Sequence, residues 1–385
     1  MTDEAEAMVI RVHGALNDVS AAAWNALVTD NHPFLRHEFL AAMEAHGCVG
    51  EHFGWIPMHL GIYSGDELVA AMPLYRKLNS YGEFVFDHAW EEAWRRTGLS
   101  YFPKLVSAVP YTPVTGRRML VKPGLETPCH KLFLHTAQAL VTEYSGSGVH
   151  WLFPEEKELQ FLKSRHLVVR NDCQFHWHNQ GYQSFDDFLS RLSARKRKNI
   201  RRERRKVKEA GVTLRRLNGF TATDKDWQDF TRFYNRLFEE KWGMATFNEA
   251  FFKAVAKALP EQVLLVMADY QGDCIAGALM FASDSRLYGR HWGCIEVIDS
   301  LHFEACYYQG IEHCIEHGLQ VFEPGAQGEH KVARGFNPVK TASAHWVSEP
   351  GFREPIQRFA NLEQRSIQAY IQQLASQTAY RKERA

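Results

Sequence analysis

The order of the predicted helices and strands is nearly the same in the two halves of this 385-residue chain. In the first half, two helical patterns before residue 46 precede two strand-like segments that meet at the Gly65-Asp66 turn signal. In the second half, helical patterns over 224–258 precede strands over 263–293, and a helix at 301–316 leads to a strand at 319–323. Each half thus has paired helices, then an antiparallel meander, then a helix and a strand. This repeated order predicts an α+β (mixed α/β) fold built from a duplicated unit.

This duplication predicts two domains, residues 1–172 and 173–385, because a chain of this length suits two cores of ordinary size better than one. A closing helix is expected over 354–375. The hydrophobic content of 45% is that of a globular protein, so a disordered chain is excluded.

A strongly basic run joins the two predicted domains. Between Arg195 and Lys208 the sequence holds ten Lys or Arg residues and one acid, Glu203, whereas the whole chain balances 45 basic against 45 acidic residues. A charge excess confined to one segment favours a docking surface for a polyanion. The alternative is a solvated helix face.

The basic run is predicted to be helical. Ser184 and Asp187 have capping-box spacing, and Gly211 stands where a left-handed helix stop is expected. The sequence therefore predicts one long helix over 185–209, with a cationic second half. Its apolar stripe consists of residues at spacings of three, four and seven: Phe185, Phe188, Leu189, Leu192, Ile200 and Val207.

The segment from Glu323 to Phe336 leaves the end of a hydrophobic strand and carries three glycines and one proline. Polar loops at strand ends are common positions for reactive groups, and glycines let backbone N–H groups approach a ligand. We therefore take this loop as the candidate reactive site; the alternative is a polar turn before a final strand. Its candidate side chains are Glu323, Gln327, Glu329, His330, Lys331 and Arg334.

The proline-rich loop over 110–118 is the corresponding segment of the first half. Arg117 or Arg118 can pair with a phosphate there, although an ordinary inter-strand loop has the same composition. Lys77, Tyr81, Asp87 and Lys104 are nearby in the sequence and can line one cleft, but the sequence alone does not place them together.

Two histidine patterns do not support a metal site. His313-Cys-Ile-Glu-His317 fits the H-x-x-E-H form, but the core stripe of its helix points both histidines away from the sheet. Cys173 to His178 has no second ligand pair at finger spacing. No Walker, dinucleotide-binding or nucleophile-elbow motif is present, and we expect neither a metal nor a bound cofactor.

The first six residues are acidic and lack the features of a signal peptide, and no apolar stretch approaches the length of a transmembrane segment. Seven scattered cysteines without a CxxC pair favour reduced thiols. These features together predict a cytoplasmic protein.

The layout resembles the GNAT acyltransferase fold used twice, and nearly the whole chain resembles the bacterial FemAB-like group of peptidoglycan biosynthesis or recognition proteins, related to Fem-type peptidyltransferases. The segments that carry this resemblance begin at His32-Pro-Phe-Leu-Arg-His, Ser80-Tyr-Gly-Glu-Phe, Ala108-Val-Pro-Tyr-Thr-Pro, Arg195-Lys-Arg-Lys-Asn-Ile, Leu287-Tyr-Gly-Arg-His-Trp and Phe322-Glu-Pro-Gly-Ala-Gln.

The resemblance implies transfer of an aminoacyl group from aminoacyl-tRNA to an amine of a cell-wall precursor, with a small-molecule or peptide amine as acceptor. It makes Lys331, four residues before Gly335, the lysine that supports the transfer, although His330 replaces the usual aromatic residue. The pattern Arg197-Lys198-Asn-Ile implies phosphate binding by Arg197, Lys198 and Arg201. It also implies an acceptor pocket in the first half, for which our candidates are Tyr111, Thr115, Arg117 and Lys104.

The segment from Gly293 to Leu301 lacks the glycine loop with which GNAT enzymes bind the coenzyme A pyrophosphate. This departure favours aminoacyl-tRNA as co-substrate over acetyl-coenzyme A. In the expected mechanism, Lys331 stabilises the developing oxyanion with Arg334 as backup, and Glu329 or Glu323 accepts the amine proton. An acyl-coenzyme A-dependent N-acetyltransferase and a non-catalytic RNA- or precursor-binding protein on the same fold are the alternatives.

Overall fold

The computed structural model describes residues 8–240 and 243–381, which fall into two compact units. The first unit comprises the chain up to Thr29 together with 34–172 and 341–367, and the second comprises 30–33, 173–340 and the C-terminal residues from 368. The expected second domain, 173–385, differs from this division at 341–367. That segment belongs to the first unit because strand β15 pairs there with strand β8.

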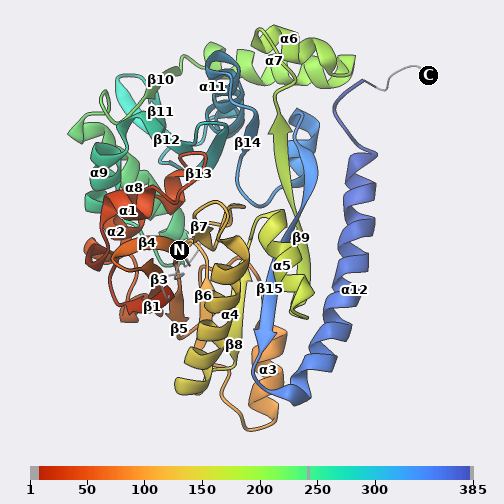
Figure 1. Cartoon of the computed structure of the whole chain (residues 1–385). Helices are drawn as coiled ribbons and strands as arrows, with labels where there is room; N and C mark the ends of the chain where they lie inside the picture. The colour runs from red at the N-terminus through yellow and green to blue at the C-terminus, as the bar shows by residue number, and fades with distance from the viewer. Residues whose placement is uncertain (1–7, 241–242, 382–385) are drawn as a thin grey trace. The chain divides into compact units, whose positions relative to one another are not determined.

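The first unit contains two groups of paired strands (Figure 1). One group is fully antiparallel, in the order β1 (Met8–His13), β3 (His59–Ser64), β4 (Glu67–Met72) and β7 (Leu120–Val121). The other has the order β15 (Asn337–Val347), β8 (Gly148–Leu152), β6 (Lys104–Ser107), β5 (Tyr75–Lys77) and β2 (Trp55–Pro57). Only β6 and β8 are parallel among these five strands.

A crossover is needed between β6 and β8, because parallel neighbours cannot be joined by a hairpin. Helix α4 lies in that connection and buries Phe133, Ala137 and Val141 in the same core as Trp151 of β8. The helices with residues in this unit are α1 (Ala21–Asn25), α2 (His37–Ala45), α3 (His88–Arg96), α4 (Glu126–Glu143), α5 (Glu156–Ser164) and most of α12 (Pro350–Ala375).

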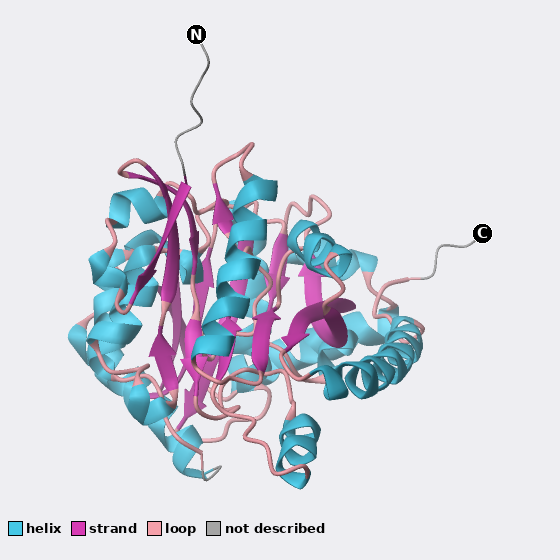
Figure 2. Ribbon diagram, turned by 60° about the horizontal axis from the view of Figure 1, so that its bottom comes forward, coloured by secondary structure: helices cyan, strands magenta, loops and turns pink. Residues whose placement is uncertain are grey.

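The second unit contains strands in the order β10 (Thr213–Leu217), β11 (Val263–Tyr270), β12 (Asp273–Ala282), β13 (Arg286–Cys294), β14 (Val321–Glu323) and β9 (Val168–His178). All neighbours are antiparallel except β13 and β14. The β11–β12 hairpin turns at Gln271 and Gly272, both with positive φ, as its two-residue connection requires. Figure 2 shows helices lying against the strands.

Strand β13 is irregular at its middle. Its pairing with β12 shifts register so that Arg290 is the extra residue of a β-bulge, between Gly289 and His291. On its other side, β13 pairs with β14 only over Arg286–Tyr288. The second half of β13 therefore continues without pairing to β14, whose last residue, Glu323, pairs with Tyr288.

The predicted helix over 185–209 is two helices, α6 (Phe185–Arg191) and α7 (Ala194–Glu209), so the single long helix was wrong. Leu192 adopts an extended conformation between them and forms a bridge with Tyr380, and Ser193 N–H donates to the Ala379 carbonyl. Pairing with this distant segment replaces the helical hydrogen bonds at the break. The expected cap at Ser184 and the left-handed Gly211 are both present.

The remaining helices of this unit are α8 (Asp224–Glu240), α9 (Glu249–Ala258), α10 (Leu301–Phe303) and α11 (Gln309–His317). A π-helical turn, Glu304–Tyr308, joins α10 and α11. In the ranges that the structure describes, no helix has the length and apolar character that crossing a membrane requires.

Candidate active site

The loop after β14 turns Lys331 into the protein interior. Its last part is a 3₁₀ segment, Glu329–Arg334, which ends at Gly335 with φ +91°. A Cβ atom at Gly335 would lie 2.9 Å from the Phe188 ring, so both the conformation and the space require glycine. This ending fixes the segment against α6 and buries Lys331.

Lys331 is a buried cation that has no counter-charge within the part of the chain that the structure describes. Its side chain is 2% exposed, and Nζ donates one hydrogen bond, to the Gly325 carbonyl at 2.7 Å. Among the described residues it makes no ion pair, and burial lowers its pKa to about 8. A perturbed, unpaired lysine at a strand end is a candidate functional group.

This lysine lies near the end of the β13–β14 pairing. A Cβ atom placed on Gly325 would be 3.8 Å from the Gly289 carbonyl oxygen and 3.9 Å from Lys331 Nζ. Gly289 is the first residue of β13 beyond its pairing with β14. The ammonium group therefore lies near the point where the pairing of β13 with β14 ends.

Arg334 connects the loop that holds Lys331, called the lysine loop below, to the basic helix α7. Its Nη2 donates to Glu203 Oε1 of α7 at 2.7 Å, its Nε donates to Tyr308 Oη at 3.1 Å, and its Nη1 donates to the His330 carbonyl at 2.8 Å. Tyr308 donates in turn to the Glu203 carboxylate. With its nitrogens engaged in this way, Arg334 is a positioning residue in this geometry.

The π-helical turn supplies aromatic groups to the same site. Tyr307 Oη and His330 Nε2 are 2.9 Å apart, and the Arg334 guanidinium lies 3.4 Å from the centre of the Phe303 ring. Turns of this kind are frequent at functional sites because they displace side chains from the regular helical positions. No sequence pattern indicated the π-helical turn, so Tyr307 and Tyr308 were not among the predicted site residues.

The two candidate carboxylates occupy different environments. Glu323 is buried and accepts from Arg286 Nη1 at 2.9 Å. Its second oxygen lies 3.7 Å from His176 Nε2 and has no hydrogen-bond partner among residues 8–240 and 243–381. Glu329 is exposed and accepts from Tyr370 Oη of α12 at 2.7 Å. Only Glu323 is therefore enclosed with an oxygen available for a proton.

Helix α7 presents most of its cations to solvent. Ile200 and Val207 are buried, and Arg204 faces inward, where it pairs with Glu304 and Glu312. The exposed cations are Arg195, Lys198, Arg201, Arg202, Arg205, Lys206 and Lys208. Arg197 is half-buried on the inward side, and Arg201 pairs with Asp186 at 2.8 Å.

The residues of the predicted acceptor loop of the first unit differ in burial. Tyr111 is buried and donates to the Cys48 carbonyl at 3.0 Å, whereas Thr115 and Arg117 are half-buried. Arg118 is fully buried and donates to backbone carbonyls, including that of Leu152 at 2.7 Å. The phosphate role considered for Arg118 is therefore wrong, because its donors stabilise the loop backbone.

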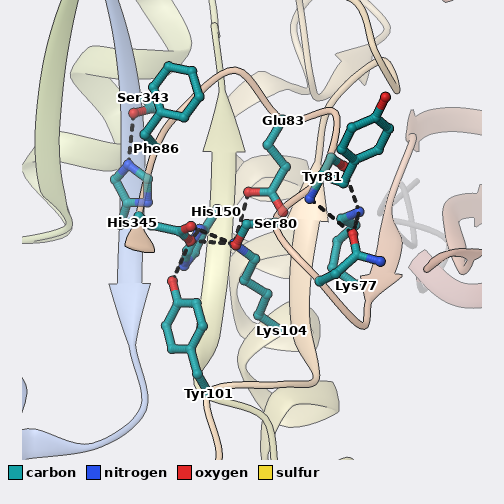
Figure 3. Close-up of polar contacts among 12 residues, drawn as sticks. Lys77, Ser80, Tyr81, Glu83, Phe86, Tyr101, Lys104, His150, Ser343 and His345 are labelled. Carbon is teal, nitrogen blue, oxygen red and sulfur yellow. Dashed lines mark hydrogen bonds and ion pairs between the residues drawn. The ribbon is translucent and has the colours of Figure 1, made fainter. Parts of the chain in front are cut away.

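Lys104 instead belongs to a buried ionic cluster (Figure 3). Its Nζ donates to Glu83 Oε2 at 2.8 Å, to Asp87 Oδ2 and to Ser80 Oγ at 3.2 Å, and Tyr101 Oη donates to Asp87 at 2.5 Å. Burial by itself raises the pKa of Asp87, but the Lys104 ammonium group holds that pKa well below its usual range.

Lys77 holds the other end of the same loop. Its Nζ donates to Asn79 Oδ1 at 3.2 Å and to the Tyr81 carbonyl at 3.1 Å, and it lies 3.9 Å from the centre of the Trp55 ring. Burial lowers the pKa of Lys77 to about 7. Lys77, Asp87 and Lys104, which the sequence alone did not place together, lie together here, and the two lysines fix the loop over residues 79–87.

Glu83, Asp87 and His150 bring three ligand atoms within 4.8 Å of one another, a spacing that suits a metal ion. The Lys104 ammonium group, however, already contacts both carboxylates. Burial lowers the pKa of His150 to about 3, so this ring adds no positive charge near neutral pH. The ammonium group occupies the position that a metal cation would need, and the cluster does not fit a metal site.

A family model described as peptidoglycan biosynthesis/recognition matches residues 15–382. The chain belongs to the FemAB-like family. No curated protein sequence matches this FemAB-like chain.

Solved structures with similar folds span nearly the whole chain. The crystal structure of FemX has a TM-score of 0.54 at 12% identity and covers 88% of this chain and 99% of its own. The C-terminal domain of a putative lysylphosphatidylglycerol synthetase from Agrobacterium fabrum has a TM-score of 0.51 at 8% identity. It covers 89% of this chain and 96% of its own. A tandem GNAT protein from the clavulanic acid biosynthesis pathway has a TM-score of 0.48 at 11% identity. It covers 89% of this chain and 99% of its own. At such identities the likeness shows the fold alone, and the FemAB-like chain shares the mixed α/β fold of FemX.

Proposed function

We propose that this FemAB-like protein is an N-acyltransferase that moves an aminoacyl group from aminoacyl-tRNA to an amine of a phosphorylated or peptidoglycan-related acceptor. The observation that carries the proposal is the position of Lys331, a buried ammonium group without a counter-charge among the described residues, near the end of the β13–β14 pairing. The family's description as peptidoglycan biosynthesis/recognition supports the class of acceptor.

Lys331 suits the stabilisation of an oxyanion. When a neutral amine attacks the ester carbonyl of the donor, the C–N bond forms and negative charge develops on the carbonyl oxygen. A positioned donor in a water-poor site typically contributes roughly 3 kcal/mol to the transition state. With a pKa of about 8, Lys331 is mostly charged at pH 7 and can supply that interaction.

Glu323 suits the proton transfer. The attacking amine must lose a proton, and Glu323 Oε2 is enclosed without a hydrogen-bond partner in the described structure. In the proposed reaction the C–O bond of the ester then breaks, and the same proton goes to the leaving hydroxyl oxygen of the carrier. Atoms and charge balance without a cofactor.

Helix α7 suits the binding of the donor's phosphates. Its exposed cations form one solvent face, while Glu203 on the opposite side bonds to Arg334 of the lysine loop. A polyanion held on that face is thus bound by the same helix that positions the loop. Such binding is expected to weaken steeply as salt rises.

The test is acyl transfer from charged tRNA to a set of amine acceptors, with wild-type protein, Lys331→Met and the exposed control Lys340→Met. We expect Lys331→Met to lose about 100-fold or more in turnover while Lys340→Met keeps it. Full activity of Lys331→Met contradicts the role of this lysine.

The donor is tested in the same assay. Transfer from acetyl-coenzyme A in place of charged tRNA identifies the coenzyme A-dependent alternative. Salt-sensitive RNA binding with no transfer from any donor identifies the non-catalytic alternative.

A further inference from the structure

We propose that the first unit carries a separate binding site for a small organic cation, an ammonium group on an apolar stem. The site is a pocket of about 320 Å³ beside α12, and every residue that lines it belongs to the first unit. Its volume is at the lower end of the range of about 300–1,000 Å³ that is usual for small-molecule sites. The proposal is independent of acyl transfer.

Phenylalanine rings form much of the pocket wall. Phe86, Phe153 and Phe359 line it, and Phe86 and Phe359 are 61% and 41% exposed. Large apolar side chains at the rim of a concave surface lose exposed area when a ligand covers them. The faces of such rings attract organic cations. The Arg170 guanidinium already lies 5.6 Å from the centre of the Phe359 ring, which leaves the exposed Phe86 ring for a ligand.

The charged groups of the pocket select against anions. Arg170 donates from Nε and Nη2 to Glu363 at 2.8 and 2.6 Å, and from Nη1 to the Phe86 carbonyl at 2.8 Å. Its guanidinium is therefore committed to protein acceptors. Asp172 adds a second carboxylate, so the lining holds two carboxylates and one arginine, and a cation is favoured.

A buried hydroxyl supplies a polar contact for the ammonium group. Thr341 is 5% exposed and its Oγ1 has no hydrogen-bond partner among the described residues. It lies two residues before Ser343 on β15, and therefore on the same face of that strand, and Ser343 lies near Phe86 (Figure 3). A buried hydroxyl left without a partner costs stability, which a ligand with N–H donors recovers.

The pocket wall is preorganised. Phe86 belongs to the loop over 79–87, which Lys77 and Lys104 fix at both ends. The Phe86 carbonyl is also bonded to Arg170. A ligand that binds here does not have to order the loop, and this lowers the cost of binding.

Isothermal titration calorimetry of the full chain with three small probes tests the proposal: 2-phenylethylamine, 3-phenylpropionate and N-acetylglucosamine. We expect one molecule of the amine to bind per chain, and neither of the other probes to bind. Loss of the carboxylate in Asp172→Asn should lower the affinity for the amine by about tenfold. Loss of the ring in Phe86→Ala should lower that affinity by about fivefold.

Leu362→Ala is the control variant, because Leu362 is 64% exposed on α12 and does not line the pocket. It should leave the affinity unchanged, and unchanged melting temperatures of all three variants show that the fold is intact. The proposal is overturned if the amine does not bind, if the propionate or the sugar binds as tightly, or if Asp172→Asn and Phe86→Ala both keep wild-type affinity. Each outcome is read without any transfer reaction, so it is distinct from the test of the proposed function.

Discussion

Lys104 of the first unit and Lys331 of the second are both buried lysines near the end of a strand, and their surroundings differ sharply. Lys104 is 0% exposed and meets the carboxylates of Glu83 and Asp87. Lys331 is 2% exposed and meets one backbone carbonyl. The first lysine is neutralised within the fold, whereas the second makes no ion pair with any residue that the structure describes.

We propose that this difference separates a structural lysine from a reactive one. A buried ion pair contributes little net stability when intact, but removal of one partner leaves a buried charge and is costly. An uncompensated buried ammonium group destabilises the fold and is retained only where something else selects for it. The two lysines should therefore respond in opposite ways to the same substitution.

Lys104→Met should have the largest effect on stability. Removal of the ammonium group leaves Glu83 and Asp87 buried together, and we expect the free energy of unfolding to fall by about 3–5 kcal/mol. Chemical denaturation measures the change. Lys122→Met, which breaks the exposed pair with Glu67, is the control and should change stability by less than about 1 kcal/mol. If Lys104→Met leaves the free energy of unfolding unchanged, Lys104 is not a structural lysine, and its contrast with Lys331 fails.

Lys331→Met should instead raise the free energy of unfolding at pH 7, by about 1–3 kcal/mol, because relief of the charge penalty exceeds the lost hydrogen bond. The folded-state pKa of about 8 lies below that of an unfolded lysine, so the wild type gains stability as pH rises from about 8 to about 10.4. The advantage of the variant should accordingly shrink across that range. Denaturation curves of both proteins at a series of pH values measure it, and a less stable variant at pH 7 would argue against an uncompensated charge.

Removal of exposed charge from α7 should weaken RNA binding by about tenfold and lower the salt slope by about two. The variant is Lys198→Ala, Arg202→Ala and Lys208→Ala combined, three exposed residues outside the ion pairs of the helix. The control combines Lys163→Ala, Lys257→Ala and Arg365→Ala, which removes the same charge from other exposed positions. Equal losses in both triple variants would show that net charge, and not α7, attracts the RNA.

The smallest effect is expected for Glu203→Ala, which frees Arg334 from α7 and loosens the loop that holds Lys331. We expect turnover to fall severalfold with little change in RNA affinity. Glu209→Ala is the control, because Glu209 is exposed on the same helix and pairs only with Arg205 among the described residues. Equal activity of the two variants would show that the contact between Glu203 and Arg334 does not affect turnover.

Much of the local structure was predictable from the sequence, and the contrast between the lysines was not. The Ser184 cap and the left-handed Gly211 follow from neighbouring residues, so a local pattern was enough. The break at Leu192 depends on pairing with Tyr380, which is close only in the folded chain. Local patterns carry no information about such distant partners.

The same reason explains what was missed in the site. The loop with Lys331 and Glu323 was identified by its glycines and its place after a strand. Lys104 was grouped with Tyr111, Thr115 and Arg117 as an acceptor candidate, although its partners come from the loop over 79–87. The contribution of Tyr307 and Tyr308 depends on the π-helical turn, which no spacing in the sequence indicated.

The protonation of Lys331 tests the account most directly. Lysine labelled with ¹³C at the ε position can be followed by NMR across a pH titration, with the Lys331 signal assigned by its absence from Lys331→Met. The account predicts that this signal titrates near pH 8, because burial without a counter-charge lowers its pKa to about 8. Titration with the exposed lysines, near pH 10.4, would show that the charge of Lys331 is compensated and would contradict the account.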